Sequence, residues 1–331
     1  MELPTYKRMM IFSGTANRPL AEEIAAHLGM KLGGVEIETF ANSESYTRFT
    51  ESVRGRDAFV IQSMCDPVDH YVIQQLIMID ALKRASAKRI TAVCPRYPYS
   101  QQDRKALGRE PITAKLIGNM YQAAGADRMV SVDLHSGQIQ GFVDVPFDHL
   151  TALPLLADYF ADVIGDDEFV IVSPDAGGVR LADKFVQHLY DHNGINNGQV
   201  AFLHKRRRRD ARNVSETKTV VGEVRGKLCI VVDDFIDTAG TLVHGVDRLV
   251  EAGASAVYAA ATHPVLSDPA VDRIKNSPIQ QVVVTNTLPI PSEKAIDKLV
   301  VLSIAPTIAQ TIKAVFEEES VSELFHGENQ P

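Results

Sequence analysis

The chain has 331 residues, of which 45% are hydrophobic and 23% charged, and these average proportions exclude a disordered or fibrous protein. Its length allows two domains of ordinary size, each with its own core. The net charge of −8 argues against a nucleic-acid-binding surface, which is normally basic over a whole face.

The amino terminus and the cysteines indicate a cytoplasmic protein. Residues 1–4 lack a basic segment leading into an apolar stretch, and nowhere do about 18 apolar residues run together, so we expect no membrane association. Cys65, Cys94 and Cys229 have no CxxC spacing. Cys94 and Cys229 lie in apolar runs, which favours packed thiols over a redox or metal role.

Short apolar, β-branched runs recur along the chain and predict strands. They span residues 9–12, 58–62, 90–93, 129–132, 169–172, 228–232, 257–261 and 281–284. Between many of them, apolar residues recur at helical spacing, as in residues 20–28, 72–82 and 242–250. Continuous apolar strands that alternate with helices predict parallel sheets covered on both faces.

A short internal similarity suggests two related halves. The segments AAGADRMVSVD (123–133) and EAGASAVYAAA (251–261) both read as a helix, a glycine stop, a polar turn and a strand. Pro146 and Pro154 flank the start of a new helical pattern, which is typical of a boundary. We therefore expect two domains, residues 1–150 and 151–331.

Three acids and a loop of small residues follow the predicted strand 228–232. Backbone N–H groups and hydroxyls at a helix start bind phosphate, whereas carboxylates repel phosphate but accept hydrogen bonds from sugar hydroxyls. A phosphorylated sugar satisfies both demands, while helix capping by an acid would explain one carboxylate rather than three. The residues concerned are Asp233, Asp234, Asp237, Thr238, Ala239, Gly240 and Thr241.

Two other strand ends carry candidate ligand groups. Residues 175–178 (Asp175, Ala176, Gly177 and Gly178) precede a helical pattern and predict a second anion-binding loop, in which Asp175 could hold a divalent cation. A plain turn is the alternative. His135 follows the strand 129–132, where a histidine is more often a hydrogen-bonded structural group than a ligand.

The block His204-Lys205-Arg206-Arg207-Arg208-Arg209 is the one basic run in an acidic protein. It is either a solvated loop or a loop that closes over bound phosphates and neutralises charge on a transferred phosphoryl group. The sequence contains neither a Walker A motif nor GxGxxG, so nucleotide binding would need other segments. The candidates are residues 40–44 and 97–105, where Phe40, Tyr97 and Tyr99 could stack a base.

The chain resembles the ribose-phosphate pyrophosphokinases over nearly its whole length. The resemblance is carried in the family's order by DLH (133–135), IQGFVDVPFDHL (139–150), IVSPDAGGVR (171–180), VVDDFIDTAGT (231–241), ATHPVLSDPA (261–270) and SVSELF (320–325). The DDxxDTAGT loop alone also marks the type I phosphoribosyltransferases. Length and the other motifs separate the two families.

The resemblance implies a set of site residues. It implies a ribose 5-phosphate site at Asp233, Asp234, Arg207 and residues 237–241, a pyrophosphate loop at residues 175–178, and magnesium ligands at His135 and Asp175. Catalytic roles fall to Lys205 and Arg207. The implied ATP site comprises Phe40, Asn42, Ser43, Glu44, Gln101, Gln102, Asp103 and Arg104. An implied regulatory anion site between subunits comprises Ser52, Arg54, Ser320 and Ser322.

The resemblance also implies the fold and the reaction. The fold is two phosphoribosyltransferase-like α/β domains, each a mainly parallel sheet flanked by helices, assembled as a homohexamer controlled by phosphate and ADP. The reaction transfers the β,γ-pyrophosphoryl group of ATP to O1 of ribose 5-phosphate with Mg²⁺, releasing AMP. Positioning and charge neutralisation would supply most of the rate.

Three departures from the family pattern concern the ATP side and regulation. The family usually has Arg-Gln-Asp-Arg where this chain has residues 101–104 (QQDR), so one cation is missing at Gln101. Glycine is common at Ser43, where a Cβ narrows the approach, and histidine is frequent at Ala176. Arg208 and Arg209 also enlarge the basic loop.

Two rival functions remain open. A type I phosphoribosyltransferase would have a single such domain with a hood for the base, and the second series of strands speaks against it. A silent family member that regulates an active partner would fit Gln101, whereas Lys205, Arg207, His135 and Asp175 speak against it.

Overall fold

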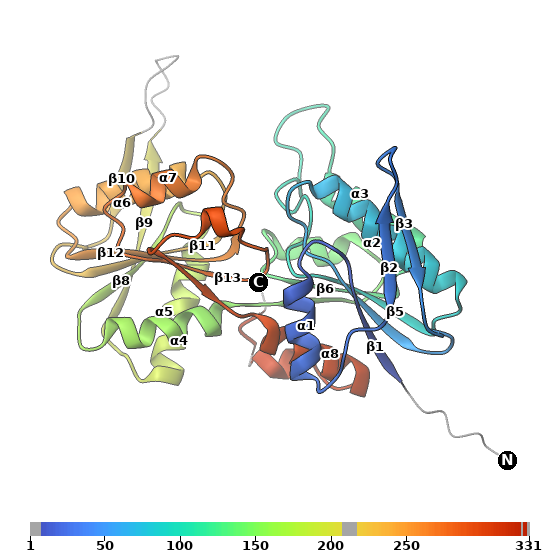
Figure 1. The fold of residues 1–331 in the computed structure, drawn as a ribbon. Coiled ribbons are helices and arrows are strands. Elements are labelled where there is room, and N and C mark those ends of the chain that lie inside the picture. Colours follow the sequence, from blue (N-terminus) through green and yellow to red (C-terminus); the bar gives the residue numbers. More distant parts are fainter. Residues whose placement is uncertain (1–7, 207–216, 326, 330–331) are drawn as a thin grey trace. The chain divides into compact units, whose positions relative to one another are not determined.

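The computed structural model describes residues 8–206, 217–325 and 327–329. It divides into two compact units: unit 1 comprises Met1–Thr151, Thr287–Pro289 and Ser303–Pro331, and unit 2 comprises Ala152–Asn286 and Ile290–Leu302. Each unit is built on one sheet (Figure 1).

Unit 1 contains a five-stranded sheet in the order β1-β4-β5-β6-β7, with every neighbouring pair parallel. Helices α2 and α3 cover one face, and α1 and α8 cover the other (Figure 1). A separate hairpin of β2 and β3 packs near α2. The elements are β1 (Met9–Ser13), α1 (Arg18–His27), β2 (Val35–Thr39), β3 (Ser45–Phe49), β4 (Asp57–Ile61), α2 (Val68–Arg84), β5 (Arg89–Cys94), α3 (Thr113–Ala124), β6 (Arg128–Val132), β7 (Phe147–Leu150) and α8 (Ala305–Glu317).

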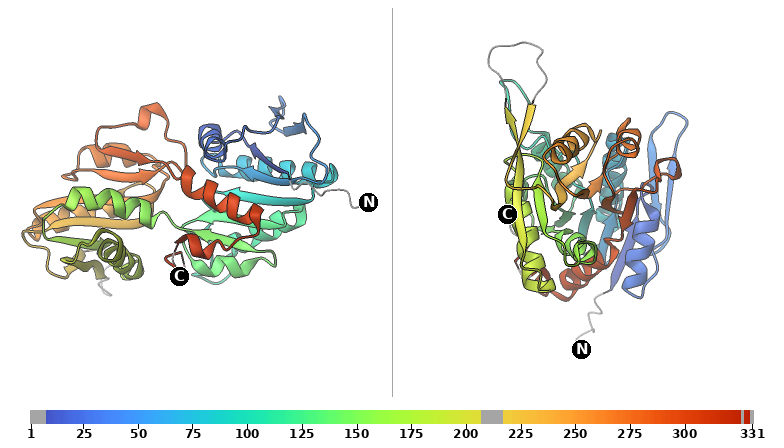
Figure 2. Two further views of the ribbon diagram at one scale, coloured as in Figure 1. Left: turned by 90° about the horizontal axis from the view of Figure 1, so that it is seen from below. Right: turned by 90° about the vertical axis from the view of Figure 1, so that its left-hand side faces the viewer.

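Unit 2 contains a seven-stranded sheet in the order β10-β9-β8-β11-β12-β13-β14, parallel except for the pair β10 and β9. Helices α4 and α5 lie on one face, and α6 and α7 lie on the other (Figures 1 and 2). The elements are α4 (Leu153–Ile164), β8 (Phe169–Ser173), α5 (Val179–Asn193), β9 (Gly198–Arg206), β10 (Thr217–Val221), β11 (Leu228–Ile236), α6 (Gly240–Glu251), β12 (Ala256–Pro264), α7 (Ala270–Lys275), β13 (Val282–Thr285) and β14 (Leu299–Leu302).

The predicted fold class is confirmed. All eight predicted strand runs appear, as β1, β4, β5, β6, β8, β11, β12 and β13. Their residues are buried on both sides, because helices cover both faces of each sheet. The hairpin of β2 and β3 was not predicted, since its residues are half-buried or exposed and form no apolar run.

The chain returns to unit 1 at its carboxyl end. Helix α8 buries Ile308 and Ile312 completely, and the carbonyl of Val315 accepts a hydrogen bond from Arg89 at 3.3 Å. The apolar stripe of α8 is thereby removed from water by unit 1. The expected division into residues 1–150 and 151–331 assigns α8 to the second domain, whereas α8 belongs to unit 1.

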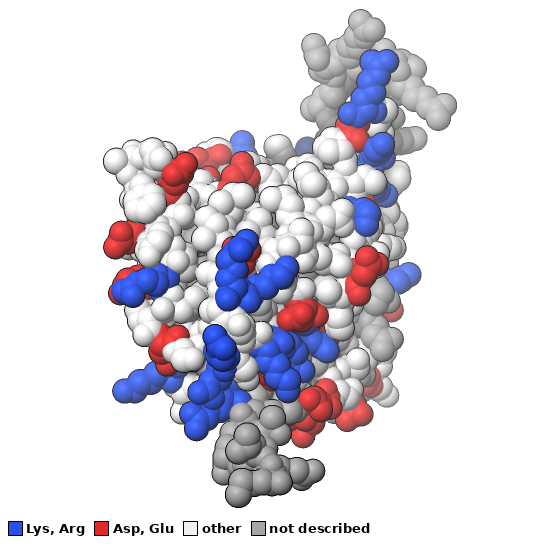
Figure 3. Space-filling model, turned by 90° about the vertical axis from the view of Figure 1, so that its right-hand side faces the viewer, with Lys and Arg blue, Asp and Glu red and all other residues white. Residues whose placement is uncertain are grey.

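Charged side chains of both signs are interspersed on the face drawn in Figure 3. Exposed ion pairs link Arg18 with Glu22 and Arg84 with Asp80, at 2.8 Å and 2.7 Å. Such exposed pairs stabilise a fold by about 1 kcal/mol at most. None of the described helices combines the length and apolar character that a membrane span requires.

A buried polar network in unit 1 joins α2 and α3 to the strands β4 and β5. Gln75 Oε1 accepts hydrogen bonds from the Tyr121 hydroxyl at 2.6 Å and from the Cys94 thiol at 3.2 Å, and Gln75 Nε2 donates to the Val60 carbonyl. Burial raises the pKa of Cys94 to about 12, so its thiol stays protonated at neutral pH. Cys94 is therefore a packed residue, as predicted.

We predict that Gln75→Leu destabilises the protein by about 2 to 4 kcal/mol, because the buried Tyr121 hydroxyl loses its acceptor. Chemical denaturation of the purified protein measures the change. Tyr121→Phe is the matched control and should cost less than half as much, since it removes the donor together with the bond. Equal losses in the two variants would contradict this account.

Candidate active site

Two of the predicted ligand loops meet at one edge of the unit 2 sheet. β8 and β11 are parallel neighbours, and Val172 pairs with Val231 in their register. The loops that follow these strands therefore leave the sheet at the same carboxyl edge. This edge is where open α/β sheets bind ligands.

Asp233 and Asp234 lie within a strand, not beyond its end. β11 continues to Ile236, with Asp233 opposite Ala261 and Phe235 opposite His263 of β12. The strand is longer than the predicted run 228–232 because β12 extends equally far and supplies a pairing partner. Only residues 237–239 form the connection to α6.

Negative charge is concentrated around Asp233. Burial, the adjacent Asp234 and the nearby Asp175 together raise the pKa of Asp233 to about 8. The Asp234 N–H donates to Asp233 Oδ1 at 3.0 Å and offsets part of this rise. The electrostatic effect of Asp175 also shows that the two loops lie close together.

The loop after β11 combines an unpaired acceptor with open donors. Asp237 Oδ1 is buried and has no hydrogen-bond partner among the described residues. Ala239 has φ +56°, in the left-handed region, and α6 begins at Gly240 with no side-chain cap in the part of the chain that is described. The start of α6 carries the positive end of the helix dipole, which favours an anion; that it binds phosphate stays a prediction.

The loop after β8 is closed by its own carboxylate. Asp175 Oδ1 accepts hydrogen bonds from the N–H groups of Gly177 at 2.7 Å and Gly178 at 3.2 Å. The Ser173 hydroxyl donates to the Asp175 carbonyl at 2.6 Å. The two amides that the sequence assigned to a phosphate are therefore occupied by a carboxylate oxygen, which stands where an anionic ligand oxygen would bind.

The predicted metal and catalytic residues belong to both units. Asp175 belongs to unit 2, while His135 is exposed in the segment after β6 of unit 1. Lys205 is the penultimate residue of β9. Arg207 lies outside the described residues.

The predicted ATP residues lie in two exposed segments of unit 1. Phe40, Asn42, Ser43 and Glu44 form the tip of the β2–β3 hairpin, where the Phe40 ring lies 5.8 Å from that of Tyr46. Ser43 has φ +71°, a conformation that glycine adopts without strain. This gives a backbone reason for the glycine that the family resemblance leads us to expect at this position.

The second ATP segment precedes α3. The side-chain oxygen of Gln102 accepts a hydrogen bond from Thr113 at 2.5 Å, so Gln102 anchors the start of that helix. Tyr97 is 1% exposed and donates to the Ala114 carbonyl, so the interpretation that it stacks a base is wrong. Its ring is part of the core. The remaining predicted residues of this segment are Gln101, Asp103 and Arg104, and Gln101 and Arg104 are exposed.

The four predicted regulatory residues are all exposed in unit 1. Ser52 and Arg54 precede β4, and Ser320 and Ser322 follow α8. Within the described chain, no hydrogen bond or ion pair joins the first pair to the second. The assignment of these residues remains a prediction.

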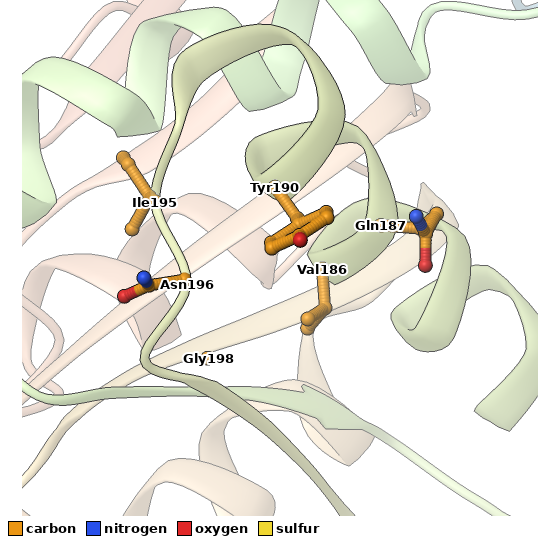
Figure 4. Close-up of a pocket in the computed structure, with 6 residues that line it drawn as sticks. All are labelled: Val186, Gln187, Tyr190, Ile195, Asn196 and Gly198. Carbon is orange, nitrogen blue, oxygen red and sulfur yellow. The ribbon is translucent and has the colours of Figure 1, made fainter.

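One pocket of about 270 Å³ lies in unit 2 away from the acidic edge. Val186, Gln187 and Tyr190 of α5 line it together with Ile195, Asn196 and Gly198 (Figure 4). Gly198 begins β9 at the amino edge of the sheet, opposite Phe169 at the start of β8. The pocket contains none of the predicted site residues.

Sequence reasoning missed one cation at the site. Arg273 of α7 donates from Nη1 to the Thr238 carbonyl at 2.8 Å. The two residues are 35 positions apart, and Arg273 lies beyond the family motif 261–270. No periodicity or spacing could connect them.

We predict that Asp233→Asn stabilises the unliganded protein as pH rises, because it removes a carboxyl that must take up a proton when the protein folds. The folded-state pKa of Asp233 lies above its unfolded value of about 4, so wild-type stability is lost as pH rises from about 4 through about 8. The advantage of the variant should grow over this window to on the order of 2 kcal/mol. Thermal melting between pH 5 and pH 9 measures it.

Asp272→Asn, which removes an exposed acid from α7, is the control and should show no such growth. If the difference in melting temperature between wild type and Asp233→Asn did not change with pH, the proposed electrostatic destabilisation by Asp233 would be contradicted.

Comparisons with known proteins agree with these motifs. The profile of the N-terminal domain of ribose phosphate pyrophosphokinase matches residues 9–125, and that of the phosphoribosyl synthetase-associated domain matches residues 209–326. Ribose-phosphate pyrophosphokinase of Streptomyces coelicolor is 51% identical over 319 residues, covering 96% of each chain. That of Corynebacterium efficiens is 49% identical over 323 residues, covering 98% of this chain and 97% of the relative.

A crystal structure shows the same fold. Phosphoribosylpyrophosphate synthetase from Mycobacterium smegmatis superposes with a TM-score of 0.88 at 49% sequence identity, and the match covers 94% of this chain and 100% of that one. Sequence motifs, full-length relatives and structure agree, and this chain belongs to the ribose-phosphate pyrophosphokinase family.

Proposed function

We propose that this enzyme transfers the β,γ-pyrophosphoryl group of ATP to O1 of ribose 5-phosphate, forming phosphoribosyl pyrophosphate and AMP. The observation that carries the proposal is the edge of the unit 2 sheet. There, carboxylates of β11 adjoin the uncapped start of α6. Membership in the family supports the same reaction.

The acids and amides of this edge suit different ends of one sugar phosphate. Asp237 Oδ1 is a buried acceptor without a partner in the described structure, and a sugar hydroxyl supplies the missing donor. Asp233 and Asp234 accept further hydroxyls. The amides of residues 238–241 and the positive end of the α6 dipole hold the 5-phosphate.

Magnesium is the proposed metal, with Asp175 and His135 as its ligands. The acidic edge fits a divalent cation, since burial, Asp234 and Asp175 together raise the pKa of Asp233, and a nearby positive charge would lower it again. Carboxylate oxygen is also the donor that Mg²⁺ prefers. When bound, the ion neutralises charge on the pyrophosphoryl group.

The remaining roles fall to residues of the ATP segments and the basic block. Phe40 stacks the base, and the polar residues of segments 42–44 and 101–104 bind the rest of ATP. Gln101 supplies a hydrogen bond but no charge, which weakens ATP binding relative to an arginine. Lys205 and Arg207 stabilise charge on the leaving and equatorial oxygens during in-line attack by O1.

The direct test is AMP formation. Purified protein incubated with ATP, Mg²⁺, inorganic phosphate and ribose 5-phosphate should release AMP and phosphoribosyl pyrophosphate in equal amounts. Omission of the sugar phosphate should abolish both products. No AMP above background would favour the silent regulatory protein, which is the second function that Gln101 leaves open.

We predict that Lys205→Ala or Arg207→Ala lowers kcat at least about 100-fold, because each removes a charge that stabilises the transition state. The Kd for ribose 5-phosphate, measured by calorimetry, should change less than kcat for Lys205→Ala. Arg208→Ala removes a neighbouring charge of the same block and is the matched control. A loss in Arg208→Ala as large as in Lys205→Ala would refute the assignment.

Assembly and regulation complete the proposal. We infer a cytoplasmic homohexamer that phosphate activates and ADP inhibits, with Ser52, Arg54, Ser320 and Ser322 at the regulatory anion site. The support is family membership together with the exposure of all four residues. Analytical ultracentrifugation and ADP titration of the AMP-forming activity test these two points separately.

A further inference from the structure

Arg273 is held in a fixed place beside the loop that follows β11. Helix α7 is anchored in the unit 2 core by Ala270 and Ile274, which are 0% and 1% exposed. Arg273 lies between them in sequence and is itself exposed. The helix therefore presents this guanidinium from a rigid base.

The segment before α7 is tied to the same loop. The N–H of Leu266 donates to the Ile236 carbonyl at 2.9 Å, and the ammonium of Lys294 donates to the Leu266 carbonyl at 2.7 Å. Leu266 is 1% exposed. The hydrogen bond between Leu266 and Ile236 therefore already joins the segment before α7 to the end of β11. The hydrogen bond from Arg273 to Thr238 is a second link, and its donor is charged.

The contact with Thr238 fixes the orientation of one peptide group. Arg273 Nη1 donates to the Thr238 carbonyl at 2.8 Å. In a trans peptide the carbonyl and the following N–H point in opposite directions, so this bond turns the Ala239 N–H away from Arg273. Ala239 is left-handed, a conformation that costs a non-glycine residue about 1 kcal/mol or more, and the bond helps to hold it.

Within the part of the chain that the structure describes, Arg273 contacts a neutral backbone group and not an acid. No ion pair with Arg273 occurs among the residues that the structure describes, and its contact at Thr238 is with a neutral carbonyl. A side chain at Gly240 would approach Arg273 Nη1 to 3.2 Å, so the guanidinium also borders the first residue of α6. Its positive charge lies against a loop whose neighbours are acids.

We infer that Arg273 is a positioning residue for ribose 5-phosphate: it fixes the peptide that joins Thr238 to Ala239, so that the loop presents the amide and not the carbonyl of this peptide to the 5-phosphate, and it adds positive charge beside the loop. The inference rests on the proposed function and adds a residue to its sugar-phosphate site. A carbonyl held by Arg273 cannot turn toward the anion, where it would repel the phosphate oxygens. The amides of the loop then meet the phosphate without reorganisation.

The test is binding of ribose 5-phosphate to the full-length protein, measured by calorimetry without ATP. Arg273→Ala should weaken the Kd about tenfold, the loss expected for one charge-assisted hydrogen bond. In the AMP-forming assay, KM for ribose 5-phosphate should rise similarly while KM for ATP stays unchanged. Arg273→Lys keeps the charge and should restore part of the affinity.

Lys275→Ala is the matched control, since it removes the same charge from the same helix and Lys275 makes no side-chain contact with the loop in the described structure. Its Kd should equal that of wild type. Equal losses in Arg273→Ala and Lys275→Ala would overturn the inference, and so would a loss in Arg273→Ala that affects ATP and ribose 5-phosphate alike.

Failure of the inference differs from failure of the proposed function. If wild-type protein binds ribose 5-phosphate and Arg273→Ala binds it equally well, only the role of Arg273 is refuted. If wild-type protein binds no ribose 5-phosphate, the proposed function and this role fall together. Thermal melting of Arg273→Ala should match wild type within about 2 °C, because the side chain is exposed.

Discussion

The proposed site depends on placing an acidic cluster beside amide donors at a helix start. Asp233 is half-buried near Asp234 and Asp175, and its burial together with these two charges raises its pKa, so a further negative charge is unfavourable there. Such an arrangement costs folding free energy in the free protein. A ligand that brings hydroxyl donors and a cation removes that cost, so the same repulsion that destabilises the empty edge favours binding.

The fold places the carboxylates for sugar hydroxyls and the amides for phosphate only a few residues apart in the chain. The acids lie on β11, which β12 extends past the ordinary end of the sheet, and the amides belong to the start of α6. A strand fixes carboxylates at regular spacing, whereas a helix start offers unpaired N–H groups and a favourable dipole. The sugar and its phosphate can therefore be bound by different secondary structures, without either group facing the wrong charge.

Features that depend on local sequence patterns could be predicted from the sequence, whereas features that depend on contacts between distant residues could not. The eight buried strands were predictable because helices on both faces impose continuous apolar runs. The PDAGG segment was predictable as a loop because its residue types are unusual after a strand. The first half of the DDxxDTAGT segment was wrongly placed beyond the strand, because the pairing of β11 with β12 that extends it is a long-range contact. The β2–β3 hairpin was missed, since cross-strand pairs such as Arg48 with Glu36 leave no apolar run. Tyr97 was misassigned because burial, not residue type, decides whether an aromatic ring packs or binds. The position of Arg273 beside the site was missed because it depends on a contact with a residue 35 positions away in the sequence.

The closed loop at Asp175 has an energetic consequence for ligand binding. Its carboxylate already satisfies the N–H groups of Gly177 and Gly178, so the free protein leaves neither amide unpaired. An incoming phosphate oxygen would replace one anionic acceptor by another, and the hydrogen-bond count would stay the same. The released carboxylate would then be available to a cation, so anion binding to the amides and metal binding to Asp175 would favour each other through one side-chain movement.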